Sequence, residues 1–137
     1  MKQATRDDPE RWIGEAEKDI DDAEMLLRHE GYYPLCRLAY LASVKAMRGL
    51  LLGKGHPFSE EADLAALSQQ VSLVEPTLGA LTTFIGPLQR FAPPARTADP
   101  DATPSPSLLY SREAAKRAIA LVRQAVAEAK RSLTALS

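Results

Sequence analysis

The segment from Cys36 to Gly55, CRLAYLASVKAMRGLLLGKG, most constrains the fold of this chain. On a helical wheel its apolar side chains occupy nearly the whole circumference, and the glycines of GKG end the pattern. A helix with that distribution is buried on most of its sides. It needs several other elements packed around it, and the rest of the chain has to supply them.

The flanking sequence supplies helices for this purpose. Apolar residues recur at three- and four-residue steps over residues 12–27 and again after Ser111, whereas no stretch shows the alternation of a strand with any strength. The fold class is therefore all-α, an antiparallel up-and-down bundle of four to five helices. We also expect a homodimer, because four helices cannot cover the whole circumference of the apolar segment.

Caps, glycines and prolines predict where the helices begin and end. Asp8-Pro9 is typical of a helix start, Ser111 of a cap, and Gly31 of an end that needs a positive φ. Pro87 should kink or end the helix that contains it. The expected helices run from Pro9 to about Glu30, from a start between Tyr32 and Pro34 to Gly53, from about Glu60 to Val71, from about Pro76 to Phe91, and from Arg112 to about Leu136.

Length and composition indicate a globular protein. The chain has 137 residues, so we expect one domain over residues 1–137, with a proline-rich loop at 92–107 that holds half of the ten prolines. A single cysteine, Cys36, excludes an intramolecular disulfide and favours a buried thiol in a reducing compartment. No apolar run is long enough to cross a membrane, so we predict a cytoplasmic protein.

Three cations interrupt the apolar segment. Arg37, Lys45 and Arg48 project within about 80° of one another at 100° per residue. Long cations usually rest their stems on the bundle and keep their charges in water, which suits Arg37 and Arg48. Lys45 stands amid leucines, where a charge has to be paired. Asp19, on the apolar side of the preceding helix, is the predicted partner.

These residues resemble the HEPN domain (higher eukaryotes and prokaryotes nucleotide-binding). The segment VKAMRGLL stands where the family commonly has an EKALKALL-like run, with Val44 in place of the acid. PARTADPD is similar to the family's RYPD-type loop, and YSREA to the start of its last helix. Further residues that carry the resemblance are Trp12, Ala16, Asp19, Ala23, Leu26, Leu27, Tyr32 and Tyr33.

The resemblance implies an up-and-down helical bundle, often dimeric, that is encoded beside a minimal nucleotidyltransferase and acts with it as a toxin–antitoxin-like pair. Other family members are metal-independent endoribonucleases with an Arg-x4-6-His motif near the start of a late helix. The two histidines here, His29 and His56, do not follow an arginine at that spacing. We therefore predict no catalytic residues, and the scattered histidines and cysteine indicate no metal site or cofactor.

A ligand pocket is the sharpest hypothesis from these residues. Lys45, Arg48, Arg96 and Tyr110 are predicted to line a shallow pocket for a nucleotide phosphate, with Asp19 holding Lys45. The competing interpretation is that Arg96 and Asp99 tie the proline-rich loop down by a salt bridge. The predicted ligand-binding residues are Asp19, Lys45, Arg48, Arg96, Asp99 and Tyr110.

The last helix carries a second row of cations. Arg112, Lys116, Arg123 and Lys130 project within about 40° of each other. They form either a solvated edge that complements the acids of the first helix or a surface for RNA phosphates. The net charge of −1 argues for a local effect.

Three functions remain open from the sequence. The first is a non-catalytic HEPN-type protein that binds a nucleotide or a partner, with a nucleotidyltransferase, a nucleotide or RNA as the expected partner and no membrane. The second is an endoribonuclease toxin with a degenerate active site. The third is a structural subunit of an assembly.

Overall fold

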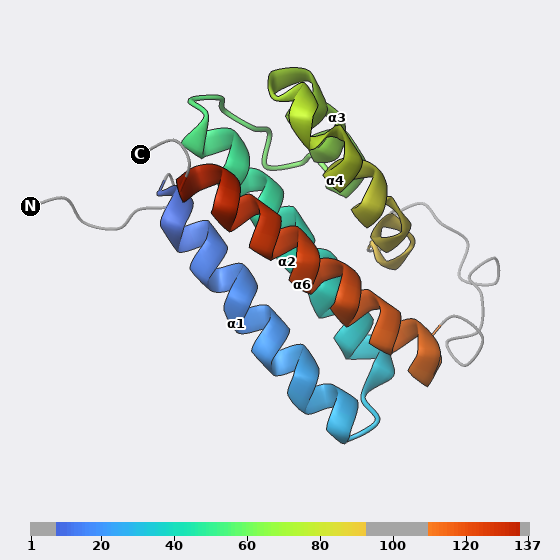
Figure 1. Ribbon diagram of the computed structural model, residues 1–137. Helices are drawn as coiled ribbons and strands as arrows, with labels where there is room; N and C mark the ends of the chain where they lie inside the picture. The colour runs from blue at the N-terminus through green and yellow to red at the C-terminus, as the bar shows by residue number, and fades with distance from the viewer. Residues whose placement is uncertain (1–7, 93–109, 135–137) are drawn as a thin grey trace, which may run out of the picture.

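Three long helices form the frame of the computed structural model, which describes residues 8–92 and 110–134. They are α1 (Pro9–Arg28), α2 (Tyr32–Gly53) and α6 (Arg112–Thr134), and α2 lies between α1 and a smaller layer of short helices (Figure 1). The described ranges contain no strand, so the predicted all-α bundle is confirmed. The short helices are α3 (Leu64–Val74), η1 (Pro76–Leu78), α4 (Gly79–Ile85) and η2 (Gly86–Phe91).

The long helices do not all alternate in direction. Along α2, Lys45 pairs with Asp19 and the later Gly49 lies against the earlier Pro9 and Ile13 of α1. Along α6, Arg123 pairs with Glu24 and the later Lys130 with the earlier Glu17, so α1 is antiparallel to both of the others. Consequently α2 and α6 run the same way (Figure 1). The short helices between them return the chain to the end at which α2 begins.

The start of α1 is confirmed, but its end differs from the prediction. Asp8 accepts a hydrogen bond from the Glu10 amide at 3.0 Å, and Pro9 is the first helical residue. At the other end it is Glu30, not Gly31, that takes the positive φ of 60°. Gly31 donates to the Leu26 carbonyl at 2.8 Å in a Schellman motif. A Cβ at Gly31 would lie 2.9 Å from the end of the Leu26 side chain, which would have to move to accommodate it.

Three further boundaries follow from caps and proline. α3 begins at Leu64 rather than Glu60, because Asp63 accepts from the Ala66 amide at 2.9 Å and caps the helix there. Pro87 ends α4 as predicted, and the chain continues as the 3-10 helix η2. Ser111 accepts from the Ala114 amide at 3.1 Å and caps α6, also as predicted.

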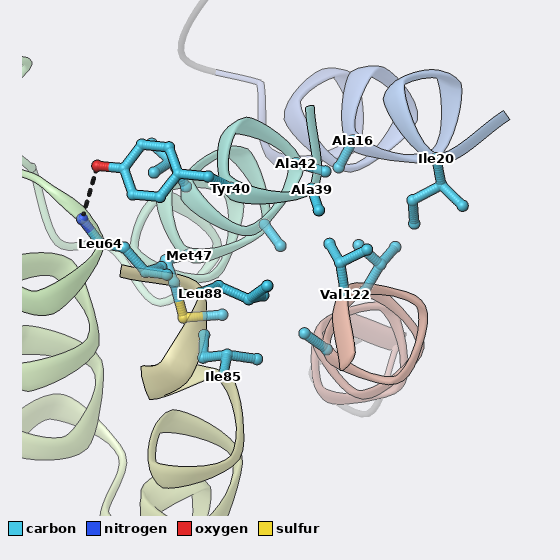
Figure 2. Packing of buried hydrophobic residues seen from close by; sticks show 14 of the residues in the cluster. Ala16, Ile20, Ala39, Tyr40, Ala42, Met47, Leu64, Ile85, Leu88 and Val122 are labelled. Atoms are coloured by element: carbon cyan, nitrogen blue, oxygen red, sulfur yellow. Dashed lines mark hydrogen bonds between the residues drawn. The ribbon is translucent and has the colours of Figure 1, made fainter. Parts of the chain in front are cut away.

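Small residues bring α1 and α2 close together. Ala16 of α1 and Ala39 and Ala42 of α2 are fully buried in the part of the core that Figure 2 shows. On its other side α2 is tied to α3, because the Leu64 amide donates to the Tyr40 hydroxyl at 3.3 Å (Figure 2). The apolar segment is thus buried on most sides, as its pattern predicts.

Within the described residues, no helix is long and apolar enough to span a membrane.

Candidate functional site

The ion pair predicted between Asp19 and Lys45 is present. Lys45 Nζ lies 2.8 Å from Asp19 Oδ2, and the Asp19 side chain is 12% exposed against 25% for Lys45. The contact balances the two charges, although Oδ2 accepts no hydrogen bond of good geometry. Each residue supplies the partner that the other needs in a largely apolar setting. The pair explains how α2 carries a lysine amid leucines.

Arg48 is held by aromatic rings and by the backbone. Its guanidinium lies 5.2 Å from the ring centre of Trp12 and 5.0 Å from that of Phe58, and the two rings meet edge to face at 5.8 Å. Arg48 also donates to the Glu60 carbonyl at 2.9 Å. These contacts fasten the α2–α3 connection to the start of α1. Arg48 therefore has a structural position in the fold.

Tyr110 lies in a different place from Lys45. Its ring centre is 4.6 Å from that of Tyr33 and 5.7 Å from that of Phe91. Tyr33 and Lys45 are twelve residues apart on α2, which is about 18 Å along a helix. The structure thus brings Asp19 and Lys45 together but does not bring Tyr110 to them. Arg96 and Asp99, in the predicted loop, lie outside the described residues.

Around Tyr110 the chain assembles an aromatic–arginine cluster, made of Tyr33, Arg37, Arg90, Phe91 and Tyr110. Arg37 donates to the Tyr33 hydroxyl at 3.4 Å and lies 5.9 Å from that ring, while Arg90 lies 5.8 Å from the Phe91 ring. Tyr33 is 47% exposed. Burial raises the pKa of the Tyr110 hydroxyl, and Tyr33 adds to that effect while Arg37 opposes it. Of these residues Tyr33 and Arg90 are exposed, Arg37 and Tyr110 are partly buried, and Phe91 belongs to the core.

The positive charge continues from this cluster onto α6. A groove of about 120 Å³ between η2 and α6 has Arg90 and Arg117 among its lining residues, beside apolar side chains such as Leu88 and Leu121. Arg112 and Lys116 are exposed in the first turns of α6. Within residues 8–92 and 110–134, none of Arg37, Arg90, Arg112, Lys116 and Arg117 has a carboxylate within 4 Å. These five cations are therefore not neutralised by a carboxylate of the described residues, although Glu113 is exposed in the same first turn of α6.

The rest of the α6 cation row has a different role. Lys130 Nζ lies 2.9 Å from a carboxylate oxygen of Glu17, and Arg123 pairs with Glu24; both acids belong to α1. Both pairs join α6 to α1. The interpretation of this row as an edge that complements the acids of the first helix is therefore confirmed for Arg123 and Lys130.

Cys36 adjoins the cluster from inside the core. It is free and fully buried, and burial raises the pKa of its thiol to about 11, an effect that Arg90 opposes.

At pH 7 to 9 we expect Cys36 of the folded protein to react with a disulfide reagent at least about 100-fold more slowly than in urea, because the thiolate is the reactive form. The change in absorbance during labelling, followed with and without urea, measures the two reaction rates. Equal rates would contradict the buried position.

Comparison with known proteins decides the family. The sequence profile described as HEPN domain matches residues 9–132, which is nearly the whole chain. The chain belongs to the HEPN domain family. Its fold is similar to that of ST0689, an archaeal HEPN homologue of known crystal structure, with a TM-score of 0.70, 22% identity, and coverage of 92% of this chain and 98% of that one. Comparison with curated proteins gives no match.

Among the described residues of this HEPN chain, neither histidine makes a hydrogen bond or ring contact with the cluster. His29 is the C-terminal cap of α1 and His56 follows α2, and both are exposed. The start of α6 carries Tyr110, Arg112 and Lys116 instead. In the described part of the chain no group of three histidine, cysteine or carboxylate residues could hold a metal ion. What this end offers is therefore aromatic surface and fixed positive charge.

Sequence reasoning missed most of the cluster. Arg90 and Phe91 were read only as the end of a helical pattern, and Arg37 only as an edge cation. The signal available was the alternation of arginine with aromatic residues near both ends of the proline-rich loop. It could not be read from sequence alone, because Tyr33, Phe91 and Tyr110 meet only in the folded chain.

Proposed function

We propose that this HEPN protein is a non-catalytic binding protein that takes a nucleotide or the phosphates of an RNA at the aromatic–arginine cluster. The observation that carries the proposal is the set of cations around an exposed tyrosine that have no carboxylate partner among the described residues. Tyr33 offers a face on which a base can stack, and Arg37 and Arg90 stand beside it for phosphate. The cluster includes Tyr110 from the predicted ligand-binding set.

The contacts of the other predicted residues favour a role in the fold. Lys45 is neutralised by Asp19, and Arg48 is engaged by two rings and a carbonyl. A phosphate at Lys45 would have to compete with a carboxylate 2.8 Å away. Ligand binding at Asp19, Lys45 and Arg48, or at Arg96 and Asp99, stays a prediction, and our proposal places the ligand at the other end of α2.

The biological setting that we propose follows from the family. The protein would act in the cytoplasm with a minimal nucleotidyltransferase, in a toxin–antitoxin-like pair. Such a partner handles nucleotides, so a nucleotide-binding cluster on the HEPN protein fits the pairing. The endoribonuclease alternative would need a proton-transfer group at the phosphate, and within the described residues neither histidine is joined to the cluster by a hydrogen bond. A purely structural subunit does not account for arginines beside an exposed tyrosine that lack a carboxylate partner among the described residues.

Thermal unfolding with ATP, GTP and a short RNA tests this proposal. A ligand at a hundred times its Kd stabilises the folded state by about 2.7 kcal/mol. We expect wild type to be stabilised and the double variant Tyr33→Ala/Arg37→Gln to lose most of that effect. Arg123→Gln, which removes an arginine from an ion pair instead, is the matched control and should respond like wild type.

Two outcomes would overturn the proposal. The first is equal stabilisation of wild type and the double variant, or none for any of the three ligands. The second is cleavage of labelled tRNA or mRNA by stoichiometric protein, which would favour the endoribonuclease alternative.

A further inference from the structure

The groove between η2 and α6 is too small for a whole ligand. Its volume is about 120 Å³, whereas pockets that enclose a drug-sized molecule have about 300 Å³ or more. Leu88 and Phe91, which line it, are buried, and Leu121 is partly buried. A space of this size and apolar character takes one flat group of a larger molecule. The groove is therefore a subsite, and the rest of its ligand has to lie outside it.

The aromatic–arginine cluster lies directly beside this subsite. Arg90 and Phe91 belong to both, since they line the groove and the Phe91 ring centre lies 5.7 Å from that of Tyr110. Tyr110 in turn lies 4.6 Å from Tyr33, whose exposed ring is the proposed stacking surface. The chain thus presents two places for flat groups, the Tyr33 ring and the groove, and Phe91 and Tyr110 join them.

Each of these two places has arginine beside it. Arg37 donates to the Tyr33 hydroxyl, while Arg90 and Arg117 line the groove. Arg90 and Arg117 are both exposed, and neither has a carboxylate within 4 Å among residues 8–92 and 110–134. Glu113 stands one turn before Arg117 on α6 but does not line the groove. The surface therefore alternates apolar places for flat groups with positive charge.

We propose that the ligand of this site is a single-stranded oligonucleotide, with one base stacked on Tyr33 and a neighbouring base in the groove between η2 and α6. A single strand repeats base and phosphate, which matches flat apolar places that have arginine beside them. The phosphate that links the two bases then lies at Arg90, which belongs to both places. This inference rests on the proposed function and narrows it, because a mononucleotide fills the Tyr33 place alone.

Calorimetric titration of the full chain with two defined ligands tests the inference. One is the dinucleotide pApA, and the other is the mononucleotide pAp, which carries the same two phosphates but only the first base. We expect wild type to bind pApA at least about tenfold more tightly than pAp, within the range that one added stacked base contributes. Charge cannot produce this result, since pAp is at least as negative as pApA.

The variant Ala114→Leu tests the place of the second base. Ala114 lines the groove and is partly buried, and a leucine there fills the groove with a residue that favours helix. In this variant the advantage of pApA over pAp should fall below about twofold. Ala120→Leu is the matched control, because Ala120 is exposed on the same helix and does not line the groove, so the wild-type ratio should persist. Circular dichroism verifies that both variants fold.

Either of two results would overturn the inference: equal affinity of wild type for pApA and pAp, or an Ala114→Leu variant that keeps the wild-type ratio. The proposed function has a separate outcome. If wild type binds both ligands equally and Tyr33→Ala/Arg37→Gln binds neither, the proposed function is supported and the second base site is wrong. If wild type binds neither ligand, both are wrong.

Discussion

Replacement of Lys45 by methionine is expected to lower the free energy of unfolding by about 2 to 3 kcal/mol. The change leaves the Asp19 carboxylate, which is 12% exposed, without its only charge partner in the described residues. Asp19→Leu should cost less, about 1 kcal/mol, because Lys45 is a quarter exposed and its long side chain can turn its charge to water. Urea unfolding measures both.

Two further variants show that pairing, not packing, causes the effect. The double variant Asp19→Leu/Lys45→Met should recover to within about 1 kcal/mol of wild type, since no buried charge remains. Lys130→Met breaks the exposed pair with Glu17 and should cost less than about 1 kcal/mol. If the double variant is less stable than both single variants, charge pairing is not what holds this site.

Gly49→Leu is expected to destabilise the protein by about 3 kcal/mol. A Cβ at Gly49 would already lie 3.2 Å from the Pro9 carbonyl oxygen and 3.2 Å from the end of Ile13. The carbonyl belongs to the α1 backbone and cannot turn aside, so a leucine has to push α1 off α2. The loss follows from overpacking between helices that meet through alanine and glycine.

Gly14→Ala is the matched control for this prediction. Nothing lies within 4 Å of a Cβ at Gly14, and that residue is exposed in the interior of α1. Alanine there should stabilise by about 0.5 to 1 kcal/mol, because it favours the helix. Urea unfolding of both variants gives the comparison. A Gly49→Leu protein as stable as wild type would show that α1 and α2 are not in close contact at this level.

Much of the fold could be predicted from residues close together in the sequence. The Asp8 and Ser111 caps, the end of α4 at Pro87 and the apolar circumference of α2 all depend on neighbours within a turn or two. The predicted Asp19–Lys45 pair is an exception, because its two residues lie on different helices and far apart in the sequence. It could be predicted because Lys45 stands amid leucines in one predicted helix and Asp19 lies on the apolar side of the other.

What could not be predicted depends on contacts between distant segments. The start of α3 was misplaced because the helical pattern alone does not show that Asp63 is its cap. The sequence places Arg48 in a ligand pocket, whereas in the structure its guanidinium contacts Trp12 and Phe58. Those contacts could not be predicted, because they form only when the α2–α3 connection folds back on α1. The cluster around Tyr110 needs three segments that are far apart in the chain.

An NMR titration of the isotope-labelled protein with ATP and with a short RNA tests the central claim most directly. The account predicts that amide shifts concentrate in three segments that meet at the cluster, residues 32–37, 88–92 and 110–117. Shifts that concentrate instead around Lys45 and Arg48, or saturating ligand with no shifts in those three segments, would contradict it.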